Sequence, residues 1–176
     1  MERMFYANGK PIGMKWYKFL IYFGLIVSPI LNLVNAFNYI TGNIYSSQTN
    51  GEVSAAIIYA YYGLGLKVLD VLYGVLMIGF AVLALVLRNK LANYKSDSLK
   101  YIKIFYSLLA VIPFSYSVVV AILTNTSVDV GAVGALIVNL VFLFLNINYF
   151  KKRAHLFIDK TVSIHIDESR EQTCDL

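Results

Sequence analysis

The sequence contains few of the residues that build metal centres, disulfides or redox sites. Its 176 residues include one cysteine, Cys174, and two histidines, His155 and His165, which all lie after the last long apolar run. A single cysteine excludes an internal disulfide, a structural zinc site and a dithiol redox centre. Histidines confined to this segment cannot hold a haem between apolar helices. We therefore expect no cofactor and no metal site.

Catalytic groups are also missing from the apolar part of the chain, which carries no paired carboxylates, no serine–histidine dyad and no cysteine pair. Acid–base catalysis, covalent catalysis and metal-assisted transfer each require such groups within reach of one another. Their absence argues against intramembrane proteolysis, quinone-linked disulfide chemistry and metal-dependent lipid transfer. We predict that the chain is not an enzyme and has no catalytic residues.

Long apolar runs dominate the sequence instead. Hydrophobic residues make up 59% of the chain, and its mean hydropathy is +0.65. Runs of about 20 residues cross roughly 30 Å of hydrocarbon as an α-helix. The chain has four such runs, at 19–40, 68–87, 104–123 and 130–150. The sequence thus predicts an all-α, integral membrane four-helix bundle over residues 1–157, followed by a largely disordered cytoplasmic tail over 158–176.

If each run crosses the membrane, nearly all the basic residues lie in segments on the same side of it. All but Lys67 of the 15 lysines and arginines lie before the first run, between the second and third, or after the fourth. The other two loops carry Glu52 and Asp129. Because bases that flank membrane helices stay on the cytoplasmic side, we expect a plasma-membrane protein with both termini cytoplasmic. The net charge of +5 then favours contact with anionic lipid headgroups rather than with nucleic acid.

Aromatic residues near the ends of the runs predict where the two membrane interfaces lie, because such side chains favour the headgroup region. The expected inner belt is Trp16, Tyr17, Tyr101, Tyr149 and Phe150. The expected outer belt is Tyr39, Tyr59, Tyr61 and Tyr62.

A signal peptide is the rival interpretation of the first run. Val34-Asn35-Ala36 matches a small-residue cleavage site. The charged region before the run is long, however, and the run itself has nearly full spanning length. Both features favour an uncleaved membrane helix.

Two halves of the sequence share a pattern. Lys15-Trp16-Tyr17-Lys18 opens the first run and Lys100-Tyr101-Ile102-Lys103 opens the third, and Pro29 and Pro113 follow at similar distances. This similarity suggests two related hairpins about a pseudo-twofold axis along the membrane normal. The alternative is coincidence, since basic-aromatic flanks and mid-span prolines are common.

The segment between the first two runs divides in two. Residues 41–53 are polar and turn-rich, whereas 54–67 are apolar and rich in tyrosine, with Ser54 as the expected N-cap. One helix from Ser54 to Leu87 would be about 50 Å long, too long for a bilayer without strong tilt. We therefore predict an outer interfacial helix that breaks near Gly63–Gly65 before the second span.

Lys67 and Asp70 are the most distinctive charged pair. They are three residues apart, so they are expected to share a helix face. An acid inside a membrane span is a candidate for ion or proton coupling. The interpretation that we favour is a salt bridge between Lys67 and Asp70 at the outer headgroup boundary.

Asparagines recur within two of the runs, at Asn32, Asn35 and Asn38 in the first and at Asn139 and Asn146 in the fourth. Amides in hydrocarbon need partners, which neighbouring helices supply through hydrogen bonds. Asn32 and Asn139 fall at similar depth, so we expect the first and fourth helices to touch through them. The alternative is that these amides line a polar substrate path.

Four strings in the chain resemble a group of uncharacterised four-transmembrane-helix membrane proteins of Gram-positive gut bacteria. The strings are Lys15-Trp16-Tyr17-Lys18-Phe19-Leu20-Ile21-Tyr22-Phe23, Asn32-Leu33, Leu66-Lys67-Val68-Leu69-Asp70 and Asn148-Tyr149-Phe150-Lys151-Lys152-Arg153-Ala154-His155-Leu156-Phe157. The likeness covers most of residues 15–157. It implies a four-span topology and a bacterial plasma membrane, and it supplies no activity and no site residues. Some of these proteins carry a cysteine zinc ribbon before the first helix, and the cysteines for one are missing here.

These observations favour a non-catalytic integral membrane protein of structural or accessory type that works through helix contacts. The alternative is a small transporter or channel subunit with Asp70 as the coupling acid. The expected partners are the lipid bilayer and either a second copy or another membrane protein. A polar cavity lined by Asp70 or by the asparagines would favour transport, whereas a tightly packed core would favour the accessory role.

Overall fold

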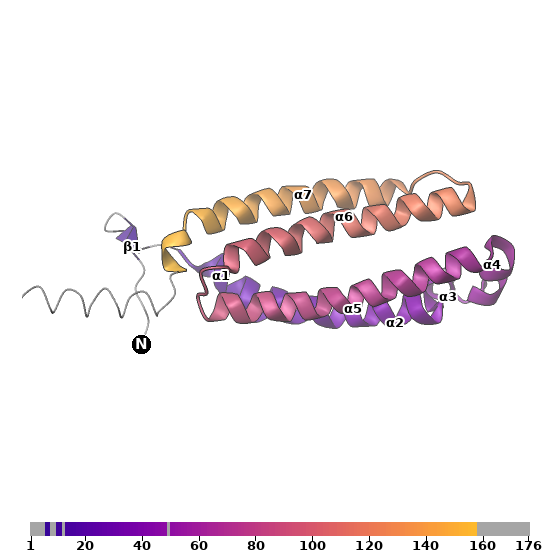
Figure 1. The fold of residues 1–176 in the computed structure, drawn as a ribbon, viewed down its shortest axis with the longest axis horizontal. Helices are drawn as coiled ribbons and strands as arrows, with labels where there is room; N and C mark the ends of the chain where they lie inside the picture. The colour runs from indigo at the N-terminus through magenta and orange to yellow at the C-terminus, as the bar shows by residue number, and fades with distance from the viewer. Residues whose placement is uncertain (1–5, 8–9, 12, 49, 158–176) are drawn as a thin grey trace, which may run out of the picture.

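The computed structural model describes residues 6–7, 10–11, 13–48 and 50–157 (Figure 1). The predicted tail, 158–176, lies outside the described residues. Two-residue strands, β1 (Tyr6–Ala7) and β2 (Lys10–Pro11), pair in antiparallel fashion ahead of the helices.

Within the described residues, four helices are long and apolar enough to cross a membrane. The first span, Lys15–Thr41, joins three elements without interruption: α1 (Lys15–Phe19), a π-helical turn (Leu20–Gly24) and α2 (Leu25–Thr41). The other spans are α5 (Leu64–Ala92), α6 (Ser98–Thr124) and α7 (Val130–Lys151). These helices confirm the predicted all-α bundle of four spans. The helices extend past the ends of their apolar runs; α6, for example, begins at Ser98, because its backbone hydrogen bonds continue through polar residues into the interface.

The spans pack as two hairpins. α2 packs along α5, α6 packs along α7, and contacts between α5 and α6 join the two layers (Figure 1). The first span and α7 are connected by hydrogen bonds at one end of the bundle, from Trp16 to Asn146 and from Tyr17 to Tyr149. Close packing therefore follows three of the four seams of the bundle. That the hairpins arose by duplication remains a prediction; the first span has a π-helical turn that α6 lacks.

The core lies where α5 faces the first span and α6. Its most buried apolar side chains include Leu25, Leu66, Leu87, Leu91 and Ile102. The outward surfaces also carry many large apolar side chains, and α7 is the least buried of the spans. This arrangement is expected where the surrounding solvent is lipid, because apolar side chains then lose nothing by facing outward.

Gly74 permits the close contact between α2 and α5. A Cβ atom at this position would lie 2.6 Å from the Ile40 Cγ1 and 3.0 Å from the Ala36 carbonyl oxygen. Real Cβ atoms do not approach other atoms so closely, so any other residue would push the two helices apart. Small residues at helix contacts are the usual means of packing in membranes.

Two short helices cover one end of the bundle, which we call the capped end. These are α3 (Asn43–Gln48) and α4 (Ala55–Tyr62). The predicted helix after Ser54 and the predicted break are confirmed, because α4 ends at Tyr62 and Gly63, with φ +88°, separates it from α5. Residues 41–53, expected to be turn-rich, are helical in part, because they contain α3. Ser54 stands at the N-cap position, yet its hydroxyl makes no capping hydrogen bond.

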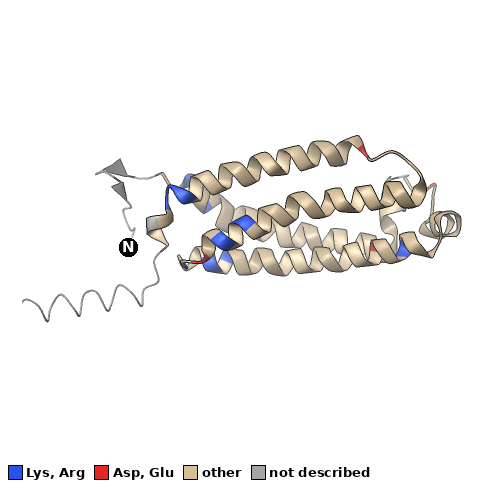
Figure 2. Ribbon diagram, turned by 45° about the horizontal axis from the view of Figure 1, so that its top comes forward, with Lys and Arg blue, Asp and Glu red and all other residues tan. Residues whose placement is uncertain are grey.

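Charge is separated along the bundle (Figure 2). Lys67 is near the capped end, whereas the other described lysines and arginines of the helices and their connections lie at the opposite end, which we call the basic end. They come from the start of the first span, the end of α5, the start of α6 and the end of α7. The side chains are Lys15, Lys18, Arg88, Lys90, Lys95, Lys100, Lys103, Lys151, Lys152 and Arg153.

Candidate functional site

Asp70 is a fully buried acid near the start of α5, with 0% of its surface exposed. Three tyrosine hydroxyls donate hydrogen bonds to its carboxyl group. Tyr45 and Tyr59 lie 2.7 Å and 2.9 Å from Oδ2, and Tyr116 lies 2.7 Å from Oδ1. Both carboxyl oxygens are therefore engaged by the protein itself.

The three donors belong to three different elements. Tyr45 is on α3, Tyr59 is on α4 and Tyr116 is on α6. A carboxylate accepts hydrogen bonds at both oxygens, and bonds to an ionised group are roughly twice as strong as neutral ones. Asp70 thus connects the two capping helices and α6 to α5 through one side chain. We call Asp70 and these three tyrosines the carboxylate–tyrosine cluster.

Further aromatic rings enclose this cluster. Tyr73 stacks on Tyr116 with ring centroids 4.3 Å apart, and Tyr39 meets both rings edge-on at 4.7 Å and 5.3 Å. The rings of Tyr45 and Tyr59 also meet edge-on, at 5.7 Å. These are the favourable offset and edge-to-face geometries of aromatic pairs. The rings replace water and lipid around the acid with a fixed aromatic wall.

A glycine with positive φ brings the capping helices together. Gly42 ends α2 in the left-handed conformation, with φ +76°, which glycine adopts without the strain that other residues suffer. A Cβ atom there would lie 2.5 Å from the Ala55 Cβ and 3.2 Å from the Tyr59 hydroxyl. Gly42 therefore allows α4 to approach closely enough for Tyr59 to reach Asp70.

Burial and the nearby Asp70 keep the hydroxyls of Tyr45 and Tyr59 protonated, so that both can donate hydrogen bonds. Burial is the main effect that raises the pKa values of Tyr45 and Tyr59 above their usual range, and the Asp70 carboxylate raises both further. Neutral hydroxyls are required for the hydrogen bonds described above, because a tyrosinate oxygen has no proton to donate. At neutral pH both tyrosines therefore remain donors to Asp70.

The predicted salt bridge between Lys67 and Asp70 is wrong. Lys67 is exposed, Asp70 is buried, and the ion pair found within the described residues joins Lys90 and Asp97 at the basic end. The reason is the direction in which each side chain leaves α5. Asp70 lies on the buried stripe of this helix, and Lys67 lies beside that stripe.

The spacing of that stripe could have revealed the buried acid. Buried residues alternate at intervals of four and three along α5, and Asp70 occupies one position of the series. Such spacing is typical of the contact face of a packed helix. The series is Leu66, Asp70, Tyr73, Met77, Phe80, Ala84, Leu87 and Leu91.

The predicted outer aromatic belt needs a similar correction. Tyr61 is 81% exposed and fits a position at the interface. Tyr39 and Tyr59 instead point inward. The Tyr39 ring contacts Tyr73 and Tyr116, and the Tyr59 hydroxyl donates to Asp70. Tyrosines at the ends of spans can serve either role, because the ring is apolar and the hydroxyl is polar.

The asparagines do not meet as predicted. The Asn32 amide donates to the Ser28 hydroxyl one turn away (3.3 Å), and the Asn139 amide donates to the Leu109 carbonyl of α6 (3.3 Å). Asn35 is exposed. The expected contact between Asn32 and Asn139 is therefore wrong, because the hydrogen bonds between their two helices lie at the basic end.

Asn146 makes the amide contact between the first and fourth spans. Its Oδ1 accepts a hydrogen bond from the Trp16 indole (3.0 Å), and its Nδ2 donates to the Phe142 carbonyl (2.8 Å). The side chain is 1% exposed. The predicted role of Asn146 as a polar contact between helices is thus confirmed, with a tryptophan as its partner.

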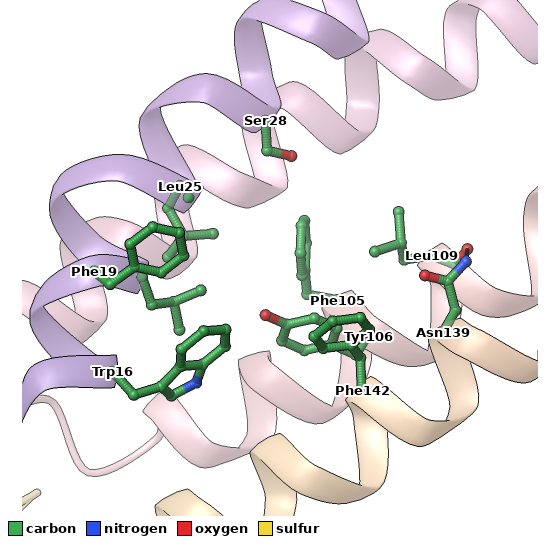
Figure 3. Close-up of a pocket in the computed structure, with 11 residues that line it drawn as sticks. Trp16, Phe19, Leu25, Ser28, Phe105, Tyr106, Leu109, Asn139 and Phe142 are labelled. Atoms are coloured by element: carbon green, nitrogen blue, oxygen red, sulfur yellow. Dashed lines mark hydrogen bonds between the residues drawn. The ribbon is translucent and has the colours of Figure 1, made fainter. Parts of the chain in front are cut away.

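A cavity of about 350 Å³ lies between the first span, α6 and α7 (Figure 3). Its walls are largely apolar, with Ser28 and Asn139 as polar members, and Asp70 is not among its lining residues. One of the candidate asparagines thus lines the cavity, but its largely apolar walls differ from the polar cavity that the transport alternative predicts. Among the described residues, no group of three histidine, cysteine or acidic side chains could hold a metal ion.

The four apolar helices mark the chain as a multi-pass membrane protein. Comparisons with protein-family models, with curated proteins and with solved structures found no match to this chain. The geometry of its own residues is therefore the basis for any functional assignment.

Proposed function

We propose that the chain is a non-catalytic plasma-membrane protein of structural or accessory type, with both termini cytoplasmic. The carboxylate–tyrosine cluster is the observation that carries this proposal. A coupling acid must exchange protons or ions with water during its cycle. Asp70 is instead fully buried, with both oxygens bonded to hydroxyls from three elements. This geometry suits an acid that fastens the capped end of the bundle.

The proposed orientation rests on the basic end. Lysines and arginines that flank membrane helices are retained in the cytoplasm, and the basic end collects such residues from four helix termini. The test is labelling with a membrane-impermeant thiol reagent in a Cys174→Ser background. A cysteine introduced by Lys95→Cys should react after the membrane is opened, and one introduced by Ser127→Cys should react in intact cells. The reverse pattern would overturn the orientation.

Proton flux separates the accessory role from transport. Vesicles that contain the purified chain and a pH-sensitive dye should collapse an imposed pH gradient no faster than empty vesicles. Asp70→Asn should leave that rate unchanged. A flux that the wild-type chain supports and that Asp70→Asn abolishes would favour the alternative function, a small transporter or channel subunit with Asp70 as the coupling acid.

The proposed setting is a bacterial plasma membrane, as the resemblance to membrane proteins of gut bacteria implies. Its partners there are the bilayer and either a second copy or another membrane protein. The exposed apolar faces of the spans support such contacts, since side chains such as Phe144, at 65% exposed, point away from the bundle. Crosslinking in native membranes, followed by mass spectrometry of the adducts, would identify the partner.

A further inference from the structure

The cavity beside Trp16 lies in the one seam of the bundle that the helices leave open. The first span packs on α5, and α7 packs on α6. The first span and α7 are joined to each other by hydrogen bonds at the basic end. The cavity lies between them and against α6, as Figure 3 shows. In a membrane, this cavity therefore faces the acyl chains of the bilayer.

The walls of this cavity suit an apolar chain. Trp16 and Phe19 from the first span face Phe105 and Leu109 of α6 and Phe142 of α7 (Figure 3). The Trp16 indole is fixed by its hydrogen bond to Asn146 and by stacking on Phe19, with centroids 5.4 Å apart. A rigid aromatic wall gives close contact to a flexible chain at little entropic cost to the protein.

We propose that an anionic phospholipid inserts one acyl chain into this cavity and places its headgroup at the basic end. The volume, about 350 Å³, is at the lower end of the range for ligand pockets, roughly 300–1,000 Å³, and fits one chain rather than a bulky ligand. A void of this size would deprive its lining of dispersion contacts, which an acyl chain restores.

Charge complementarity selects an anionic headgroup. Lys15 is four residues before Phe19 and Lys103 is three before Tyr106, so each lies one turn nearer the basic end on roughly the same helix face as a lining residue. Both lysines are exposed, and neither side chain makes a hydrogen bond or an ion pair within the described part of the chain. Each basic side chain near a membrane surface contributes about a fivefold preference for anionic lipid. The proposal rests on membrane insertion, and it is independent of the accessory role.

The chain carries its own probe for this site, because Trp16 is its single tryptophan. The full-length protein is reconstituted in phosphatidylcholine vesicles with increasing fractions of phosphatidylglycerol. In separate series, one of the two lipids carries bromines near the glycerol end of its acyl chains. Bromine quenches tryptophan fluorescence on contact, so each series reports which lipid lies against Trp16.

Three variants make the measurement specific. Trp16→Phe combined with Tyr22→Trp moves the probe to a position that is 71% exposed and faces bulk lipid. Ser28→Phe fills the cavity from the first span, where the Ser28 side chain points into it (Figure 3). Lys15→Gln combined with Lys103→Gln removes the charges and leaves the cavity unchanged.

The proposal predicts that brominated phosphatidylglycerol quenches Trp16 with an apparent affinity at least about fivefold above that of brominated phosphatidylcholine. The probe at position 22 should follow the bulk lipid composition. Ser28→Phe should reduce quenching by both lipids, and the double glutamine variant should remove the preference alone.

Equal quenching of Trp16 by both lipids would overturn the anionic site. Absence of quenching by either lipid would overturn lipid occupancy, and it is the result expected if another helix fills the seam. If the chain failed to insert, the probe at position 22 would also stay unquenched. That control separates a failure of membrane insertion from a failure of the lipid site.

Discussion

Removal of the Asp70 carboxyl group should strongly destabilise the bundle. Asp70→Ala deletes the acceptor of three hydroxyls that come from α3, α4 and α6. A hydrogen bond to a charged group contributes roughly 1.5–3 kcal/mol, so three give a gross loss of about 5–9 kcal/mol. Two effects reduce this sum. Tyr45 and Tyr59 are partly exposed and can bond water, and the substitution also removes a buried charge that is costly to desolvate. We expect a net loss of about 3 kcal/mol.

The assay is thermal unfolding in detergent micelles, followed by circular dichroism. For a chain of this length, 3 kcal/mol corresponds to a fall in Tm of about 6–12 °C. Asp70→Asn keeps one acceptor oxygen and should fall between wild type and Asp70→Ala. The control is Glu52→Gln, which neutralises an exposed acid near the same end of the bundle.

An interfacial salt bridge would give a different result, since exposed ion pairs contribute about 1 kcal/mol or less. A Tm for Asp70→Ala within about 2 °C of that of Glu52→Gln would therefore refute the buried cluster. Tyr116→Phe offers a second check, because it removes one donor and retains the ring that stacks on Tyr73. Its Tm should fall by less than that of Asp70→Ala.

Three further predictions test the parts around this cluster. Gly42→Ala should lower stability and increase proteolysis between α3 and α4, because it strains a residue with φ +76° and places a Cβ atom 2.5 Å from the first residue of α4; unchanged proteolysis would contradict the close approach. Gly74→Ala should lower Tm through its contact with Ile40, and Ile40→Ala in the same chain should restore part of the loss; equal loss in single and double variants would contradict this contact. Burial and Asp70 raise the pKa values of Tyr45 and Tyr59, so their contribution is complete below the unfolded-state pKa of about 10 and is lost as pH rises above it. The difference in Tm between wild type and the variant that combines Tyr45→Phe with Tyr59→Phe should thus be constant from pH 7 to about 10 and shrink above it. A difference that stays constant at higher pH would argue against buried donors.

Much of the architecture follows from features that can be read along the chain. Each predicted apolar run lies within one of the four long helices, because the length and hydropathy of a run determine whether it can cross hydrocarbon. The break at Gly63 was predictable for a similar reason, since a helix from Ser54 to Leu87 is too long for the bilayer. The basic end was also predictable from the positions of the basic residues along the chain. Because consecutive spans run in opposite directions, the segments that carry these residues all lie at one end of the bundle.

The candidate site required the tertiary structure. The spacing of Lys67 and Asp70 suggested a pair, yet the acid bonds tyrosines that lie 25, 11 and 46 residues away in the sequence. Asn32 and Asn139, which lie at similar depth in the sequence pattern, do not contact each other. Asn146 instead accepts a hydrogen bond from Trp16, which is 130 residues away. Length, hydropathy and charge are properties of local sequence, so the sequence alone determined the spans and the basic end. Which buried side chains meet depends on how helices rotate and cross, and only the packing of the whole bundle decides those angles.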